Sequence, residues 1–197
     1  MTDTTAKQAD WIASKVNYEV KHVLDMGFNH GTSTIWWLQR FPNAKVRSID
    51  NVPIPQDIEQ VQKLAGDRFE FIEGDTQFVV DEIPTIFDFI YIDTAHDRLT
   101  TFRELVAAWS KLKQGGVLAG HDYHYKGDSC RPNWPGDVKT AVDEFCKYMG
   151  VRFETDVVDD PTTGVFVIYK DYGKDGAIRA TKSSMFLKPT DTPSKFH

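Results

Sequence analysis

The sequence has few cysteines, no long apolar run and no cluster of basic residues. Its two cysteines, Cys130 and Cys146, are too few for a disulfide framework, so we expect reduced thiols. No apolar segment reaches the length of a membrane-spanning helix, and the polar start MTDTTAKQADW lacks the pattern of a secretory signal. The formal net charge of -6 argues against nucleic acid as the main partner, since phosphate binding depends on clustered Lys and Arg. We therefore expect a cytoplasmic protein with neither a membrane nor a nucleic-acid partner.

The bulk composition is that of one globular domain. The chain has 197 residues, of which 41% are hydrophobic and 26% are charged, and it shows no internal repeat or low-complexity segment. We expect a single domain over residues 1–170, with an N-terminal helical extension over 1–20. The apolar pattern fades after Lys170, so residues 171–197 are predicted to be a C-terminal extension that wraps the domain or is partly mobile. The sequence leaves a homo-oligomer open.

Apolar runs alternate with helical patterns, and this order is typical of βαβ units around a parallel sheet. The segment 87–93 (FDFIYID) is apolar on both faces, which predicts a strand buried in mid-sheet. Gly115 and Gly116 suit the turn between a helix and the fifth strand. The polar, Gly- and Pro-rich segment 123–136 predicts a long loop. Its aromatic residues Tyr123, Tyr125 and Trp134 either cover an acceptor as a lid or pack the loop onto the domain. The predicted strands are 22–27, 45–50, 69–74, 87–93 and 116–122, followed by an antiparallel pair at 151–158 and 164–170; the predicted helices are 31–41, 57–65, 99–112 and 138–149.

Acidic residues recur where the first four predicted strands end. Each could be a helix cap or part of a turn when taken alone, but four in consecutive strands are hard to dismiss, because parallel strands all end at the same edge of a sheet. Asp50 is placed where a carboxylate can accept two hydrogen bonds from a ribose diol. Two glycines after the first strand let the backbone turn sharply and approach a ligand closely. The residues in question are Asp25, Gly27, Gly31, Asp50, Asp75 and Asp93.

With these residues in place, the chain resembles the class I S-adenosylmethionine-dependent methyltransferases. The resemblance covers about residues 21–170, and the segments IYID...H and GGVLAGHDY are similar to those of small O-methyltransferases of the methyltransferase family 24 type. It implies a Rossmann-like, three-layer α/β sandwich with a mostly parallel seven-stranded sheet and an antiparallel terminal strand. It also implies that S-adenosylmethionine is bound through its methionine part by Asp25 and the glycine turn, through its ribose by Asp50, and through its adenine by Asp75. The full set implied for the cofactor is Asp25, Gly27, Phe28, Asn29, Gly31, Asp50, Asn51, Asp75, Thr76 and Asp93.

A nicotinamide dinucleotide oxidoreductase is the main competing enzyme. Asp50 follows the glycines at about the spacing that the dinucleotide fingerprint asks for. The loop nevertheless lacks the central glycine of GxGxxG, which lets a pyrophosphate approach the backbone, and the chain has no room for a separate substrate domain. The sulfonium cofactor carries no pyrophosphate, so the sequence favours the methyltransferase.

Histidines and acids follow the fourth and fifth predicted strands, whose ends should be neighbours. Methyl transfer to oxygen requires an aligned acceptor and removal of its proton, and a divalent cation at a group of carboxylates and imidazoles could assist. Metal-dependent catechol-type O-methyltransferases are similar in layout, and matching their motifs places metal ligands on Asp93, His121 and Asp122 and the general base on His96. His96 replaces a lysine of that pattern, and the His-Asp pair replaces an acid-amide pair.

The alternative is that these side chains have only structural roles. His96 would then cap the following helix, His121 would be packed or hydrogen-bonded at the strand end, and Asp122 would order the loop. Mg²⁺ or another divalent cation tolerates imidazole without preferring it. Trp36 and Trp37 are assigned to packing, without a chemical role.

Three functions follow from the sequence. The first is O-methylation of a small hydroxyl acceptor, a phenol or a sugar, with Asp93 and His96 as catalytic residues and metal assistance left open. The second is the nicotinamide oxidoreductase. The third is a catalytically silent module that keeps the cofactor pocket.

Overall fold

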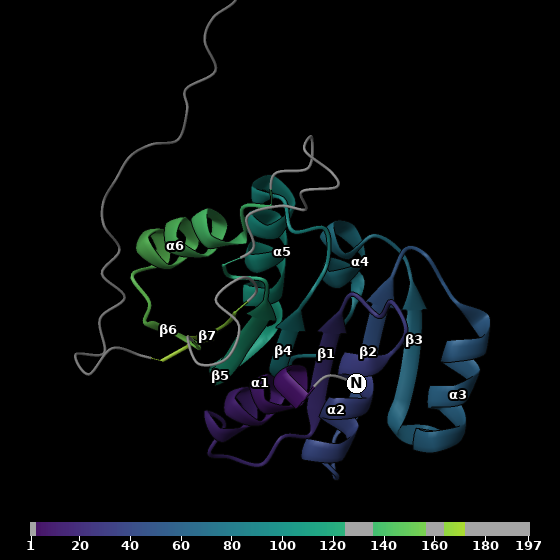
Figure 1. Cartoon of the computed structure of the whole chain (residues 1–197). Coiled ribbons are helices and arrows are strands. Elements are labelled where there is room, and N and C mark those ends of the chain that lie inside the picture. Colours follow the sequence, from purple (N-terminus) through teal and green to yellow (C-terminus); the bar gives the residue numbers. More distant parts are fainter. Residues whose placement is uncertain (1–2, 125–135, 157–163, 172–197) are drawn as a thin grey trace, which may run out of the picture.

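The computed structural model describes residues 3–124, 136–156 and 164–171, and these residues form a seven-stranded sheet between two layers of helices (Figure 1). The strands lie in the order β3-β2-β1-β4-β5-β7-β6. The order reverses at β1 and β4, which is the place where open α/β sheets bind their ligands. The strands are β1 (His22–Met26), β2 (Lys45–Asp50), β3 (Phe69–Glu73), β4 (Phe87–Ile92), β5 (Leu112–His121), β6 (Phe153–Asp156) and β7 (Val165–Tyr169).

Strand directions agree with the predicted architecture. Strands β1 to β5 pair in parallel, β7 is antiparallel to β5, and β6 is antiparallel to β7. The central strands are apolar on both faces because helices cover both faces, as parallel sheets require. The predicted Rossmann-like fold with an antiparallel strand near its end is thus confirmed.

Two separate cores fill the spaces between the sheet and its helices. On one face, α4, α5 and α6 contribute apolar residues such as Val80, Leu105 and Phe145. On the other face, α1, α2 and α3 contribute residues such as Ile12, Trp37 and Val61. The helices are α1 (Asp3–Ser14), α2 (Thr32–Arg40), α3 (Pro55–Ala65), α4 (Thr76–Glu82), α5 (Arg98–Lys111) and α6 (Val138–Met149), and a 3₁₀ turn (Gly66–Arg68) follows α3.

Three details differ from the sequence prediction. Helix α4 was not predicted, because it has only seven residues and begins only three positions after the end of β3. Helix α3 begins at Pro55, two residues early, since proline is tolerated in the first helical turn. Gly115 and Gly116 lie inside β5 and not in a turn before it, because β5 begins directly after α5 and its pairing with β4 shifts register there.

Some predictions fall on residues that the structure leaves undescribed. Tyr125 and Trp134 of the predicted lid lie outside the described residues, and so does the predicted C-terminal extension except for Asp171. Within the described ranges, no helix has both the length and the apolar character needed to cross a membrane.

Candidate functional site

A cavity of about 1030 Å³ opens at the carboxyl ends of β1 to β4. Its volume is at the upper end of the range for small-molecule sites. The strand-end residues converge on it from positions far apart in the sequence. Among its lining residues are Gly27, Phe28, Asn29, Asp50, Asn51, Gly74, Asp75, Thr76, Asp93 and His96.

The turn after β1 has no room for a side chain at Gly27. A Cβ atom there would lie 1.9 Å from the carbonyl oxygen of Asp93, and the backbone φ of 99° is one that L side chains rarely adopt. The Asp93 N–H also donates to the Met26 carbonyl oxygen at 2.8 Å. The close approach of two strand ends therefore requires glycine at this position.

Asp50 is held in place by the backbone around it. The Asn29 N–H donates to Oδ2 at 2.8 Å, and the Val52 N–H donates to Oδ1 at 2.9 Å. Each carboxylate oxygen can accept a further hydrogen bond, so the side chain can still bind a vicinal diol at the cavity wall. A carboxylate that accepts from both hydroxyl groups of a diol fits the ribose of an adenosyl ligand.

The wall beyond β3 is formed by the first turn of α4 and by two residues of α5, Thr100 and Glu104. Asp75 caps α4 by accepting a hydrogen bond from the Gln77 N–H at 2.9 Å. The hydroxyl groups of Thr76 and Thr94 both donate to the carboxyl group of Glu104, whose side chain is buried. Glu104 lines the cavity and was not identified from the sequence.

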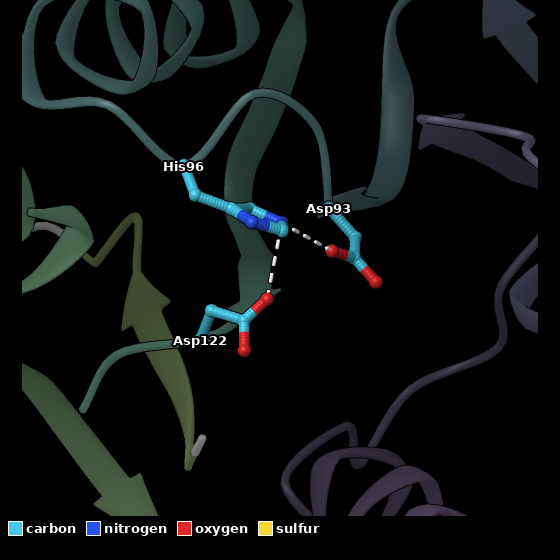
Figure 2. A group of neighbouring side chains, drawn as sticks. All are labelled: Asp93, His96 and Asp122. Atoms are coloured by element: carbon cyan, nitrogen blue, oxygen red, sulfur yellow. Dashed lines mark hydrogen bonds and ion pairs between the residues drawn. The ribbon is translucent and has the colours of Figure 1, made fainter. Parts of the chain in front are cut away.

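His96 lies between two carboxylates that come from different strand ends (Figure 2). Its Nε2 atom is 3.0 Å from Asp93 Oδ1 and 3.0 Å from Asp122 Oδ2. Both His96 and Asp122 have positive φ angles, 61° and 60°, which are uncommon for residues other than glycine. Such strained positions concentrate at functional sites.

The two carboxylates favour the charged form of His96. Burial by itself would lower the pKa of the imidazole, and the charge of His121 acts in the same direction. The hydrogen bond with Asp93 and the charges of Asp122 and Asp93 outweigh both, so the pKa is raised above its ordinary value. An imidazole in this place can accept a proton and keep it as a stabilised imidazolium.

The structure groups a different trio from the predicted ligand set. Ligand atoms of Asp93, His96 and Asp122 all lie within 4.8 Å of one another. His121 is outside this trio: its Nδ1 is 3.2 Å from Asp122 Oδ1, and its Nε2 is 3.2 Å from Gln8 Oε1 on α1. His96 does not cap the following helix, which was the structural alternative for it. The residue that caps α5 is Asp97, which accepts hydrogen bonds from two backbone N–H groups.

Two residues predicted for the cofactor lie behind the cavity wall. Asp25 is fully buried, and its Oδ2 accepts hydrogen bonds from Ser33 at 2.9 Å and Thr34 at 2.5 Å. Burial raises the pKa of Asp25 to about 7, against the effect of these hydrogen bonds. Gly31 adopts a left-handed φ of 74° just before α2 and likewise is not part of the cavity lining. Both residues shape the turn that carries Ser33 and Gly27 into the wall.

Sequence reasoning also missed Trp36 and Thr5, which line the cavity from α2 and α1. Trp36 was assigned to packing, and it does pack, since only 7% of it is exposed. No periodic signal in the sequence distinguishes a buried aromatic residue that also lines a cavity from one that only packs. Thr5 reaches the cavity through the docking of α1, which the local sequence does not reveal.

Comparison with known proteins identifies relatives of this chain. Residues 24–123 match the model of a family described as a methyltransferase domain. A trans-aconitate 2-methyltransferase from Deinococcus radiodurans is 36% identical over 98 residues, a match that covers 49% of this chain and 36% of that protein. The chain thus spans little more than a third of the curated relative.

Solved structures share the fold. A proposed O-methyltransferase from Nostoc punctiforme has a TM-score of 0.67 at 22% identity, with 84% of this chain and 56% of that chain covered. The 1,6-didemethyltoxoflavin-N1-methyltransferase of Burkholderia thailandensis, with bound 1,6-didemethyltoxoflavin and S-adenosylhomocysteine, has a TM-score of 0.65 at 16% identity, covering 86% and 80% of the two chains.

Proposed function

We propose a specific reaction for this chain, which belongs to the methyltransferase domain family of class I S-adenosylmethionine-dependent methyltransferases. The proposed reaction is methylation of a hydroxyl group of a small acceptor, a phenol or a sugar. The observation that carries this proposal is the cavity at the strand ends, which has a fixed carboxylate for a ribose at Asp50 and a histidine between two acids at the neighbouring strand ends.

The chain's residues would hold the cofactor along the edge of the sheet. The turn at Gly27, with Ser33 beside it, would hold the methionine part. Asp50 and Asn51 would bind the ribose, and Asp75 with Thr76 would face the adenine. S-adenosylmethionine supplies a methyl group that is already activated by the sulfonium. The protein therefore has to align the acceptor and remove the proton of its hydroxyl group.

His96 is proposed as the proton acceptor. In the transfer, the sulfur–methyl bond breaks, a bond between the acceptor oxygen and the methyl carbon forms, and the hydroxyl proton moves to the neutral imidazole of His96. Nε2–H of the resulting imidazolium donates to the carboxylates of Asp93 and Asp122, each 3.0 Å away, and their charges stabilise the cation. General base catalysis of this kind needs only that the acceptor oxygen lie within hydrogen-bond distance of His96.

A divalent cation is a second candidate at the same place. The ligand atoms of Asp93, His96 and Asp122 lie within 4.8 Å of one another, and two carboxylates with an imidazole suit Mn²⁺ or Mg²⁺. A cation bound there would hold the acceptor hydroxyl and lower its pKa. If it used His96 Nε2, the histidine could not act as the base, so the two roles are alternatives.

The cofactor site is tested by replacing Asp50 with alanine. We expect S-adenosylhomocysteine binding, measured by calorimetry, to weaken by about 100-fold, because two charge-assisted hydrogen bonds to the ribose would be lost. Asp67→Ala, in the exposed turn after α3, is the matched control and should bind as the wild type does. Equal affinity of the Asp50 and Asp67 variants would remove the proposed ribose site, and NADH binding in its place would favour the dinucleotide enzyme.

The cation is tested by titrating Mn²⁺ into the protein saturated with S-adenosylhomocysteine. If the trio binds a cation, the wild type takes up one Mn²⁺ per chain, and Asp122→Asn weakens binding at least about tenfold through loss of one charged ligand. Asp67→Asn again serves as the control. Absence of binding to the wild type, or unchanged binding to Asp122→Asn, would leave His96 as the base without a cation.

The acceptor is sought by a screen of phenols and sugars with labelled S-adenosylmethionine, with trans-aconitate included because the Deinococcus relative is named for it. Asp93 lines the reacting end of the cavity and Asp122 lies 3.0 Å from His96, so without a cation this end should repel a polycarboxylate and accept a neutral hydroxyl compound. Transfer to trans-aconitate and to no hydroxyl compound would overturn the hydroxyl proposal. Cofactor binding without transfer to any acceptor would favour the catalytically silent module.

A further inference from the structure

Glu104 is a buried acid in the cavity wall that the proposed reaction does not use. Its side chain is fully buried in the second turn of α5, yet it belongs to the lining of the cavity. Thr76 contacts one carboxyl oxygen and Thr94 contacts the other. A buried acid normally has a cation partner, and the structure gives Glu104 two hydroxyl groups.

The two threonines belong to different parts of the site. Thr76 is the first residue of α4, directly after Asp75, on the side proposed for the adenine. Thr94 directly follows Asp93 and lies two residues before His96, on the side proposed for the reaction. Glu104 is therefore the side chain that connects the nucleoside side of the cavity with the loop that carries the proposed catalytic groups.

The surroundings of Glu104 favour its neutral form. Burial is the main cause that raises its pKa, to about 7, and the carboxylates of Asp75 at the start of α4 and Asp97 at the start of α5 raise it further. The hydrogen bonds from Thr76 and Thr94 act in the opposite direction. A neutral carboxyl group can accept one of these hydrogen bonds and donate the other, because threonine hydroxyl groups rotate.

We propose that Glu104 is a positioning residue: in its neutral form it fixes Thr76 and Thr94 relative to each other, and so sets the distance between the adenine wall and the loop of Asp93 and His96. This inference rests on the proposed function, since it assumes that an adenosyl ligand occupies the cavity. It assigns no proton transfer to Glu104 and no contact with the reacting atoms.

Glutamine is the informative replacement, because its amide has the shape and hydrogen-bonding pattern of a neutral carboxyl group. At pH 6 we expect Glu104→Gln to bind S-adenosylhomocysteine within about threefold of the wild type, as measured by calorimetry. Glu104→Ala leaves two threonine hydroxyl groups facing a gap, and we expect affinity to fall about 10- to 100-fold. Val106→Ala, at an exposed position of the same helix, should leave affinity unchanged.

The dependence on pH separates this role from simple packing. Because the folded pKa is raised above the model value of 4.5, the neutral form persists up to about pH 7 and is lost above it. We expect wild-type affinity for S-adenosylhomocysteine to fall about tenfold between pH 6 and pH 8.5, since ionisation adds a charge beside Asp75 and Asp97. Glu104→Gln should show a clearly smaller fall, and what remains is due to Asp25, whose pKa is also raised to about 7.

The outcomes distinguish failure of the proposed function from failure of the positioning role of Glu104. A wild type that does not bind S-adenosylhomocysteine contradicts the proposed function itself. A wild type that binds, together with a Glu104→Gln variant as weak as Glu104→Ala or as dependent on pH as the wild type, overturns the positioning role alone. If Glu104→Ala does not fold, Thr94→Val replaces it, and affinity equal to the wild type would count against the role.

Discussion

Replacement of His96 with alanine is expected to lower the rate of methyl transfer by about 10²- to 10⁴-fold, the range typical for loss of a general base. The imidazole is the only side chain of the Asp93, His96 and Asp122 trio that can accept the proton and remain stabilised by the other two. Turnover would be measured with labelled S-adenosylmethionine and the best acceptor from the screen. Binding of S-adenosylhomocysteine should change much less, because His96 lies at the reacting end.

His22→Ala is the matched control for this experiment. His22 is exposed at the first position of β1, at the opposite end of that strand from the cavity, and its removal should leave turnover unchanged. A His96→Ala enzyme with wild-type turnover would exclude the histidine as base and would point to a hydroxyl that is already ionised or to an acceptor without a proton to lose.

Replacement of Gly27 with alanine is expected to disrupt the site and to lower the free energy of unfolding by about 3 kcal/mol or more. The new Cβ atom would lie 1.9 Å from the Asp93 carbonyl oxygen, so one of the two strand ends must move. That movement would break the hydrogen bond between the Asp93 N–H and Met26 that joins β1 to the loop after β4. Urea unfolding measures the loss of stability, and calorimetry with S-adenosylhomocysteine measures the loss of binding.

Gly150→Ala separates the steric clash from backbone strain. Gly150 also has a left-handed φ, 65°, but nothing lies within 4 Å of a Cβ atom built there. Its replacement should cost only the conformational strain, about 1 kcal/mol. If Gly27→Ala were no more destabilising than Gly150→Ala, the close approach of the two strand ends would not be a constraint on this fold.

Much of the fold could be predicted from the sequence because the relevant signals are local. Apolar runs on both faces mark the central strands, and the alternation of strands with helical patterns determines a parallel sheet. Acids at Asp50, Asp75 and Asp93 could be placed at one edge for the same reason, since parallel strands end together. Helix α4 was not predicted because a helix of seven residues shows too little hydrophobic periodicity to be recognised in the sequence.

By itself, the sequence determined the order of the strands and of the longer helices, and the acidic residues at one edge of the sheet. Only the tertiary structure decided which of these side chains meet. In the structure, His96 lies between Asp93 and Asp122, and His121 contacts Gln8 on α1. Asp25 is fully buried and does not line the cavity. The tertiary structure also joined Glu104 to two threonines that are 28 and 10 residues away in the chain. Chain order fixes the edge to which a residue belongs, whereas the direction of its side chain depends on backbone angles and on packing against elements distant in the sequence.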